Sequence, residues 1–327
     1  MQPVVSVIVP IYKVEKFINR CITSLMEQSL ESVEYIFVDD ASPDSSMQIL
    51  DKVLLQYPHR LGHMKILQHK ENKGLPAARN TGLAAASGEY VFHCDSDDYL
   101  EVDALEQMYN LAHEQNADIV WCDWFLTFEK NERYMKQPSY SSSMDALKAM
   151  LSGAMKYNVW NKLVRQSLYV EHQIEFPTGY GMGEDMTMMM LMAYADKVVY
   201  LPKAFYHYVK LNTNAFSQTY SDKHLVELKH NVARIETFME KKFGKELEKE
   251  LAFLKLEAKF PFLIGDSKQK YHQWTEWYPE ANKYIRDNKC ISSRSRFIQL
   301  CAARKQFWIV KLYYLLVIKL MYGIFYK

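Results

Sequence analysis

Hydrophobic and polar positions follow a repeating pattern over roughly the first hundred residues of the chain. Four short runs have the length and composition of buried strands: residues 4–10, 34–38, 65–68 and 89–94. Three stretches between them place apolar side chains at helical spacing: residues 14–28, 43–57 and 75–86. Ser42 and Pro43 are expected to cap and open the second of these helices. This alternation predicts an α/β fold of right-handed βαβ units, with a parallel sheet that helices cover on both faces.

The composition changes twice after the fourth predicted strand. Residues 129–143 are polar and contain a proline and three consecutive serines, which predicts a surface loop. Residues 224–259 are heavily charged and helical in pattern. A chain of 327 residues is long enough for one large domain with an extension. We therefore expect a domain over residues 1–215, in halves 1–125 and 126–215, and a helical C-terminal region over 216–327.

Acidic residues directly follow two of the predicted strands. Asp39 and Asp40 follow the second strand, and Asp95-Ser96-Asp97-Asp98 follows the fourth. In parallel α/β sheets, ligands bind outside the carboxyl ends of the strands. Asp95 and Asp97, one residue apart where a strand gives way to a turn, can both approach one Mg²⁺ or Mn²⁺ shared with substrate phosphates. An acidic turn that caps the next helix is the alternative, and the place after a buried strand favours the metal site.

Asp39 and Asp40 have two interpretations. A capping pair is the more common role of such residues, while a carboxylate at a strand end can also accept a hydrogen bond from a uracil N3–H. Arg79 lies near the start of the third predicted helix, whose N-terminus favours anions. Arg79 could contact a phosphate or hold an Asp of the acidic turn, and a solvated helix face is an equal alternative.

Three later clusters are candidates for a second substrate. Glu184 and Asp185 follow a glycine-rich turn, where a carboxylate either caps a helix or deprotonates a hydroxyl, contributing about 10²–10⁴-fold as a general base. The other two clusters, residues 160–162 and 206–208, combine aromatic and polar side chains. Most such clusters serve packing, but aromatic faces also stack on sugar rings. Trp160, Lys162 and His207 are therefore candidates on the acceptor side of a site, with Glu184.

Taken in this order, the motifs resemble those of the family-2 inverting glycosyltransferases of the GT-A fold, of the bacterial surface-polysaccharide type. The resemblance is carried by residues 5–12, 37–42, 72–80, 88–91, 95–98 and 183–185. It implies an α/β fold with a mixed, mainly parallel sheet flanked by helices, and a helical C-terminal extension. It also implies that residues 1–125 form a nucleotide-binding half and residues 126–215 an acceptor-binding half. It further implies Asp97 as the main metal ligand with Asp95 beside it, and Asp185 as the catalytic base. The nucleotide contacts that it implies come from Pro10, Tyr12, Asp40, Arg79, Asp95 and Ser96.

The function that this resemblance implies is metal-dependent, inverting transfer of one sugar from a nucleotide-sugar donor, expected to be UDP-linked. The acceptor would be a hydroxyl of a glycan or lipid-linked glycan, and the cofactor Mn²⁺ or Mg²⁺. The Gln-x-x-Arg-Trp motif of processive members is absent from the sequence, so transfer of one sugar per encounter is expected.

Two other functions are weighed against this one. A nucleotidyltransferase acting on sugar phosphates would have a Gly-Gly-x-Gly-Thr-Arg-like loop after its first strand, where this chain has Pro10-Ile11-Tyr12-Lys13. A receiver-type signalling domain, which is not an enzyme, would end near residue 125 and needs no Asp-x-Asp after a fourth strand.

Charge and cysteine content bear on location. Eight basic and no acidic residues lie in the last forty, so the rest of the chain carries seven more acidic than basic residues. An acidic body disfavours nucleic acid as a partner. Five widely spaced cysteines are typical of reduced thiols in a cytosolic compartment. The first residues lead directly into a strand, so no signal peptide is expected.

The end of the chain is apolar and basic. Residues 307–326 are twenty in number, a borderline length for a membrane span. On a helix over about 304–326, four basic residues fall within a sector of about 120°; they are Arg304, Lys305, Lys311 and Lys319. A helix lying on an anionic membrane surface explains this pattern best, with docking on the protein itself and a true span as alternatives. We therefore expect a cytoplasmic protein, peripheral on the cytoplasmic face of the inner membrane.

Overall fold

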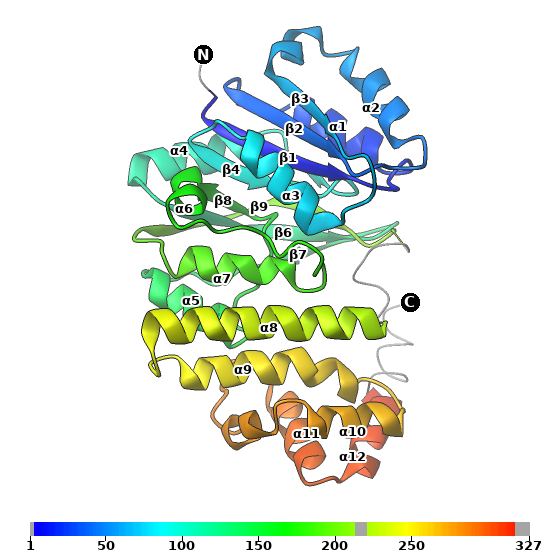
Figure 1. Cartoon of the computed structure of the whole chain (residues 1–327), viewed down its shortest axis with the longest axis vertical. Helices are drawn as coiled ribbons and strands as arrows, with labels where there is room; N and C mark the ends of the chain where they lie inside the picture. The colour runs from blue at the N-terminus through cyan, green and yellow to red at the C-terminus, as the bar shows by residue number, and fades with distance from the viewer. Residues whose placement is uncertain (1–2, 213–220, 318–327) are drawn as a thin grey trace. The chain divides into compact units, whose positions relative to one another are not determined.

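The computed structural model describes residues 3–212 and 221–317. The first predicted strand forms as β1 (Val5–Ile11), which lies at the centre of the parallel half of the sheet (Figure 1). β2 (Val33–Asp39) and β4 (Tyr90–His93) lie on either side of β1, and β3 (Met64–Gln68) lies beyond β2, all parallel. Every residue of β1, β2 and β4 is buried. The β-branched runs therefore form buried strands, as predicted.

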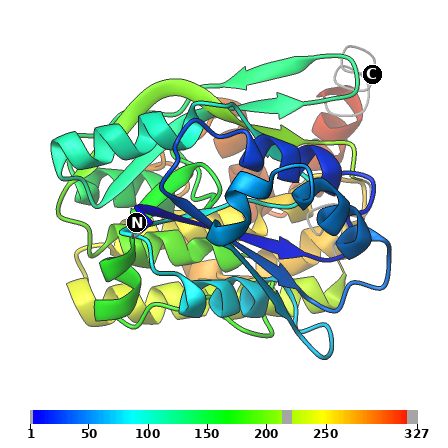
Figure 2. The same cartoon turned by 90° about the horizontal axis from the view of Figure 1, so that it is seen from above.

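Helices cover both faces of these strands. α1 (Ile18–Met26) and α2 (Ser46–Leu54) pack against each other, and α3 (Leu75–Ala85) packs on β1 and β2 (Figures 1 and 2). Gly82 sets how closely α3 approaches the sheet, because a Cβ at this position would lie 2.4 Å from the side chain of Ile8. Only a residue without a side chain allows that approach.

The second half of the sheet is largely antiparallel. β8 (Lys162–Arg165) pairs antiparallel with β4 and with β6 (Ile119–Thr127), and β9 (Val198–Val209) runs parallel to β6. β5 (Tyr99–Leu100) pairs with β9, and β7 (Glu132–Met135) pairs with β6. The nine strands in the described part of the chain thus form one mixed sheet in the order β3-β2-β1-β4-β8-β6-β9-β5, with β7 beside β6. The prediction of a mixed sheet flanked by helices is confirmed.

Two local predictions are wrong. The second helix starts at Ser46 and not at Pro43, because the carboxylate of Asp44 accepts hydrogen bonds from the backbone and hydroxyl of Ser46 and from the hydroxyl of Ser42. The predicted loop over residues 129–143 contains β7, whose side chains are mostly exposed. A short polar strand at the side of a sheet carries no hydrophobic alternation that would reveal it.

The remaining helices complete the described chain. Around the second half of the sheet lie α4 (Ala104–Gln115), α6 (Gln166–Glu171), η2 (Glu184–Met186) and α7 (Thr187–Met192), and η1 (Pro58–His63) precedes β3. By their contacts, residues 1–146 and 157–231 form one unit, and residues 147–156 and 232–327 form another. α5 (Ser143–Leu151) and α8 (Asp222–Phe243) contain residues of both. A domain division at residue 215 remains a prediction.

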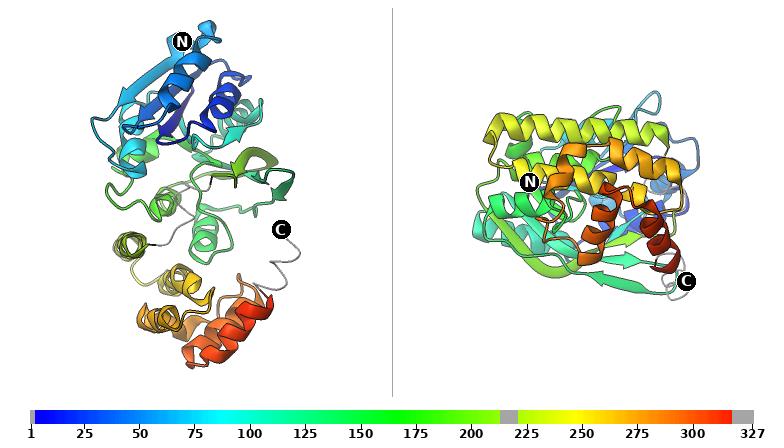
Figure 3. Two further views of the ribbon diagram at one scale, coloured as in Figure 1. Left: turned by 90° about the vertical axis from the view of Figure 1, so that its right-hand side faces the viewer. Right: turned by 90° about the horizontal axis from the view of Figure 1, so that it is seen from below.

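The second unit is helical, as predicted for the C-terminal region (Figure 3). Its further elements are α9 (Glu248–Lys259), η4 (Phe260–Leu263), α10 (Lys268–Glu276), η5 (Pro279–Tyr284), α11 (Ser293–Ala303) and α12 (Phe307–Tyr313). In its core the Lys259 ammonium lies 4.1 Å from the centre of the Trp274 ring.

The predicted helix over about 304–326 begins at Phe307, and its part from residue 318 on lies outside the described residues. Within residues 3–212 and 221–317, no helix has both the length and the apolar character needed to cross a bilayer.

Candidate active site

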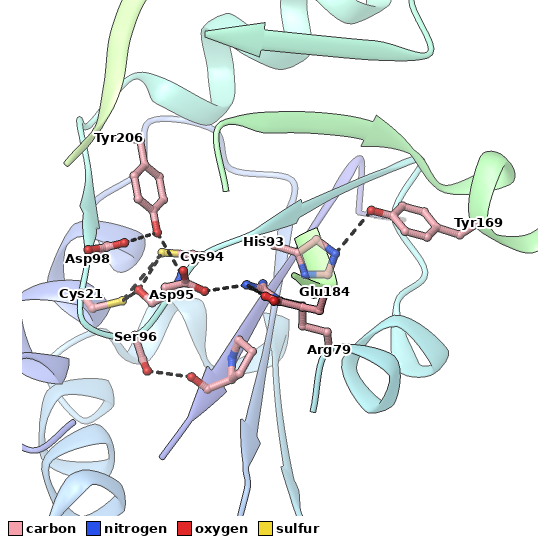
Figure 4. Close-up of polar contacts among 11 residues, drawn as sticks. Cys21, Arg79, His93, Cys94, Asp95, Ser96, Asp98, Tyr169, Glu184 and Tyr206 are labelled. Carbon is pink, nitrogen blue, oxygen red and sulfur yellow. Dashed lines mark hydrogen bonds and ion pairs between the residues drawn. The ribbon is translucent and has the colours of Figure 1, made fainter. Parts of the chain in front are cut away.

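The acidic turn, residues 95–98, follows the carboxyl end of β4 and lies beside β1 (Figure 4). The Ser96 hydroxyl donates to the carbonyl oxygen of Pro10 at 2.7 Å, which joins the turn to the end of β1. Both oxygens of Asp98 are engaged, since Oδ2 accepts from the Tyr206 hydroxyl at 2.8 Å and Oδ1 from the Val209 N–H at 2.7 Å. Asp98 is therefore an anchor of the turn, while Asp95 and Asp97 keep more of their carboxylate surface available.

Negative charge accumulates in this turn. Burial and then the charge of Asp95 raise the pKa of Asp97, and burial and then the neighbouring carboxylates raise the pKa of Asp98 well above its usual range. A divalent cation would offset this repulsion, and oxygen ligands are those that Mg²⁺ and Mn²⁺ prefer. Within residues 3–212 and 221–317, no group of three or more His, Cys, Asp or Glu side chains is arranged to hold a metal ion. Asp95 and Asp97 fit a cation whose remaining ligands come from a phosphate-bearing substrate and water.

Arg79 connects the acidic turn to a second acidic pair. Its guanidinium is buried on α3, with Nη2 2.9 Å from Asp95 Oδ1 and 3.6 Å from Glu184 Oε1 (Figure 4). Burial disfavours the charge on Arg79, but Asp95, Glu184 and Asp185 outweigh it and raise its pKa. The buried Nε and Nη1 atoms have no hydrogen-bond partner among the residues that the structure describes. Because unpaired buried donors are costly, these two groups could serve an anionic or hydroxylic ligand.

The second acidic pair, Glu184 and Asp185, lies on the short helix η2. Gly183 precedes it with a φ of 88°, a left-handed conformation that favours glycine. Burial and then the charge of Asp185 raise the pKa of Glu184 well above its usual range, which favours its protonated form. Burial raises the pKa of Asp185 to about 6, with Arg79 opposing the rise. Its buried Oδ1 has no hydrogen-bond partner in the described part of the chain, so this oxygen could accept a proton.

Two of the acceptor-side candidates lie in the interior at the start of β8. Lys162 is fully buried, and its ammonium donates to the Asn158 carbonyl at 2.6 Å and to Asn161 Oδ1 at 2.8 Å. Burial lowers the pKa of Lys162 to about 7, with the charge of Asp185 opposing this effect. Trp160 is 5% exposed and stacks on Tyr206, with the ring centres 4.4 Å apart. Trp160 therefore packs behind the acidic turn in this structure.

Asp40 lies at the carboxyl end of β2, where it holds the loop before α3. Its carboxylate oxygens accept from the backbone N–H groups of Lys73 and Gly74, both at 2.8 Å, and contact the His69 ring at 2.6 Å. Two carboxylate oxygens offer about four acceptor positions, so one position remains for a ligand. Tyr12 follows β1 and is 38% exposed, which leaves its ring open to a ligand.

Asp39 acts as the cap of a turn, because its Oδ1 accepts from the Ser42 N–H at 2.8 Å.

His207 lies apart from the acidic turn. Its ring stacks on Tyr99 and its nitrogens contact Glu132 and Glu101 at 2.8 and 2.9 Å. Successive side chains of a strand point to opposite faces, so the neighbouring Tyr206 of β9 faces the acidic turn instead. Alternation along a strand over residues 198–209 is the sequence signal that separates these two side chains.

Comparison with known proteins places this site in a family. The family model described as glycosyl transferase family 2 matches residues 6–185. The chain is 31% identical over 229 residues to the glycosyltransferase EpsH of Bacillus subtilis, which covers 68% of this chain and 64% of EpsH. It is 30% identical over 262 residues to GlyA of Streptococcus pneumoniae, covering 76% of this chain and 36% of GlyA. The chain therefore spans less than two thirds of the length of either relative.

Solved structures share the fold. TarS of S. aureus, in a complex with UDP-GlcNAc, has a TM-score of 0.71 at 22% identity, over 96% of this chain and 91% of that one. The mannosyltransferase PcManGT of Pyrobaculum calidifontis, in a complex with GDP-Man and Mn²⁺, has a TM-score of 0.53 at 16% identity, over 94% and 88%. The expected GT-A architecture with its helical C-terminal part is confirmed. Since the family model covers more than half of its residues, the chain belongs to glycosyl transferase family 2.

Proposed function

We propose that this protein transfers one sugar from a nucleotide-sugar to a hydroxyl of a glycan or lipid-linked glycan, with inversion at the anomeric carbon. The observation that carries the proposal is that Arg79 links the acidic turn, through Asp95, with Glu184 and the charge of its neighbour Asp185. The turn suits a leaving diphosphate and its cation. Asp185 would accept the proton of an acceptor hydroxyl. Arg79 therefore connects the residues proposed to bind the leaving group with the proposed base.

The donor would lie across the ends of β1, β2 and β4. Tyr12 and Asp40 would contact the base, and Ser96 and the end of β1 at Pro10 would line the ribose. Arg79 has two unpaired donors near Asp95, and these support a contact with the diphosphate. A UDP-linked donor is favoured because the TarS neighbour was solved with UDP-GlcNAc, although PcManGT was solved with GDP-Man. A carboxylate such as Asp40 can accept a hydrogen bond from the N3–H of uracil.

Asp97, with Asp95 beside it, would hold Mn²⁺ or Mg²⁺. When bound, such a cation supplies Lewis-acid stabilisation of the charge that develops on the leaving diphosphate. The chain's own contribution is to orient these carboxylates through Ser96, Asp98 and Arg79.

Asp185 would be the general base. Its Oδ1 would take the proton of the acceptor hydroxyl as the hydroxyl oxygen forms a bond to the anomeric carbon and the bond to the nucleoside diphosphate breaks. Glu184 is less suited to this role, because burial and the charge of Asp185 raise its pKa well above its usual range. A base whose pKa lies near the working pH combines a large ionised fraction with useful basicity.

Relatives and surface features support a role in surface-glycan assembly at a membrane. The chain is 32% identical over 193 residues to the poly(ribitol-phosphate) beta-glucosyltransferase of Bacillus spizizenii, covering 57% of this chain and 29% of that protein.

An anionic membrane surface is proposed as the partner of the C-terminal helices. Along α12 and its continuation, Trp308, Leu312, Leu315 and Leu316 form an exposed apolar stripe. Arg304, Lys305 and Lys311 beside it are exposed, as a helix in the headgroup plane requires. We propose the cytoplasmic face of the inner membrane as the surface that this helix contacts.

The proposed donor site is tested by thermal unfolding with a panel of nucleotides and nucleotide-sugars in the presence of Mn²⁺. A ligand that binds the folded state raises the midpoint by mass action, by about 2.7 kcal/mol of stability at a hundred times its dissociation constant. We expect UDP or a UDP-sugar to raise the midpoint in a Mn²⁺-dependent manner. A response to GDP or dTDP alone would reassign the nucleotide, and no response to any member would contradict the donor site.

A further inference from the structure

Three groups on β9 and just after it hold the carboxylates of Asp97 and Asp98. β4, which carries the turn, pairs with β1 and β8 but not with β9. Nevertheless the Tyr206 hydroxyl and the Val209 N–H bind Asp98, and the Asn212 amide donates to Asp97 Oδ2 at 2.8 Å. The position of the acidic turn is therefore set by a strand that lies about 110 residues later in the chain.

The Tyr206 hydroxyl bridges two residues of the turn. It donates its single proton to Asp98 Oδ2 at 2.8 Å and accepts from the Asp95 N–H at 3.0 Å (Figure 4). Burial and then Asp98 raise the pKa of Tyr206 well above its usual range, so the phenol keeps that proton. The bridge ties the backbone of Asp95 to the anchor Asp98, with Asp97 between them.

The ring that carries this hydroxyl is itself held in place. Tyr206 is completely buried, and Trp160 stacks on it at 4.4 Å with an interplanar angle of 20°. Phe92 of β4 contacts it from another side, with the ring centres 6.5 Å apart. A hydroxyl on such a packed ring acts as a fixed bridge, which is the kind of support that holds ligating carboxylates in position.

We propose that Tyr206 and Asn212 are positioning residues of the donor site. Tyr206 ties the backbone of Asp95 to the carboxylate of Asp98 and so fixes the two ends of the turn, and Asn212 orients the carboxylate of Asp97 between them. This inference rests on the proposed function. It also gives Trp160 a role, since that side chain would support Tyr206 and would not contact the acceptor.

The test substitutes Tyr206→Phe, which removes only the hydroxyl, and Asn212→Ala. The matched control is Tyr90→Phe, because Tyr90 is also a buried tyrosine of this sheet and its hydroxyl donates to the Ala117 carbonyl, away from the turn. Two quantities are measured on the full chain: Mn²⁺ binding in the presence of UDP, by electron paramagnetic resonance, and release of UDP from a UDP-sugar as Mn²⁺ is varied.

Loss of a group that supports a metal-binding carboxylate typically lowers affinity or activity by about 10–100-fold. We expect Tyr206→Phe and Asn212→Ala to raise the half-saturating Mn²⁺ concentration by about tenfold or more. Tyr90→Phe should lower the unfolding midpoint but leave the Mn²⁺ requirement unchanged. Thermal unfolding of each variant separates a loss of folding from a loss of positioning.

The outcomes separate this inference from the function on which it rests. If wild-type protein binds Mn²⁺ with UDP but both site variants bind it equally well, the positioning role is wrong and the proposed function stands. If Tyr90→Phe changes the Mn²⁺ requirement as much as Tyr206→Phe does, the effect is general destabilisation and the inference also fails. If the wild type neither binds Mn²⁺ with a nucleotide nor consumes a nucleotide-sugar, the proposed function and this inference both fail.

Discussion

At the carboxylate of Asp185, burial and charge act in opposite directions. Burial disfavours ionisation, whereas Arg79 and Lys162 favour it, and the pKa settles at about 6. The same carboxylate has a buried oxygen without a partner. A residue that served only as a helix cap would use its oxygens on backbone N–H groups, so the environment of Asp185 favours the general-base interpretation.

Replacement of this base should separate binding from turnover. We expect Asp185→Asn to retain donor binding, measured by calorimetry with UDP and Mn²⁺, and to lose about 10²–10⁴-fold in kcat. Asp51→Asn, an exposed carboxylate on α2, is the control and should behave as wild type. Full activity of Asp185→Asn would mean that the base lies elsewhere.

The pH dependence of turnover follows from the same pKa. Asp185 must be ionised to accept a proton, and its pKa of about 6 means that it becomes protonated as pH falls through that value. We expect kcat/KM to be level near pH 7.5 and to fall about tenfold per pH unit below pH 6. The measurement is a pH profile from 4.5 to 8 with the donor held constant. A profile that stays flat down to pH 5 would contradict the assignment.

Among the elements, α3 determines where Arg79 reaches the acidic turn. Gly82 lets this helix lie directly on Ile8 of β1. We expect Gly82→Ala to destabilise the protein by about 1–3 kcal/mol through overpacking and to weaken activity by moving Arg79. Gly62→Ala is the control, since a Cβ there meets nothing within 4 Å. Denaturant unfolding measures the difference, and equal stability of the two variants would contradict the packing argument.

The elements also show how far sequence can predict this site. The β-branched runs and the acidic residues that follow them were sufficient to place Asp40, Asp95 and Asp97 at the ends of parallel strands, because local pattern determines those strands. The contribution of β9 could not be found in this way. Tyr206 and Asn212 reach the turn through pairings between distant segments, and nothing in the local sequence around residue 206 reports which strand lies beside the turn. The assignment of His207 to the acceptor side has a different cause, because alternation along β9 turns His207 to the face opposite to that of Tyr206.

For the whole molecule, the exposed stripe on α12 predicts a membrane contact. We expect Trp308→Ala combined with Leu312→Ala to weaken binding to vesicles containing anionic phosphatidylglycerol by about tenfold or more, because both exposed side chains would enter the headgroup region. Binding should also weaken as salt is raised, since the flanking charges are basic. Co-sedimentation with vesicles is the measurement.

Leu55→Ala is the matched control for this prediction, because Leu55 is an equally exposed apolar residue at the end of α2. It should leave vesicle binding unchanged. If the double variant binds as tightly as wild type, the stripe on α12 is not the membrane contact.

The central claim is that the acidic turn serves a nucleotide-sugar. The most direct measurement is release of nucleoside diphosphate from a panel of nucleotide-sugars, with and without Mn²⁺, by wild type, Asp97→Ala and the exposed control Asp51→Ala. We predict that wild type and the control consume at least one donor, a UDP-sugar, only when Mn²⁺ is present, and that Asp97→Ala loses about 100-fold or more. Turnover that is unchanged in Asp97→Ala, or the absence of turnover of every donor by wild type, would contradict the account.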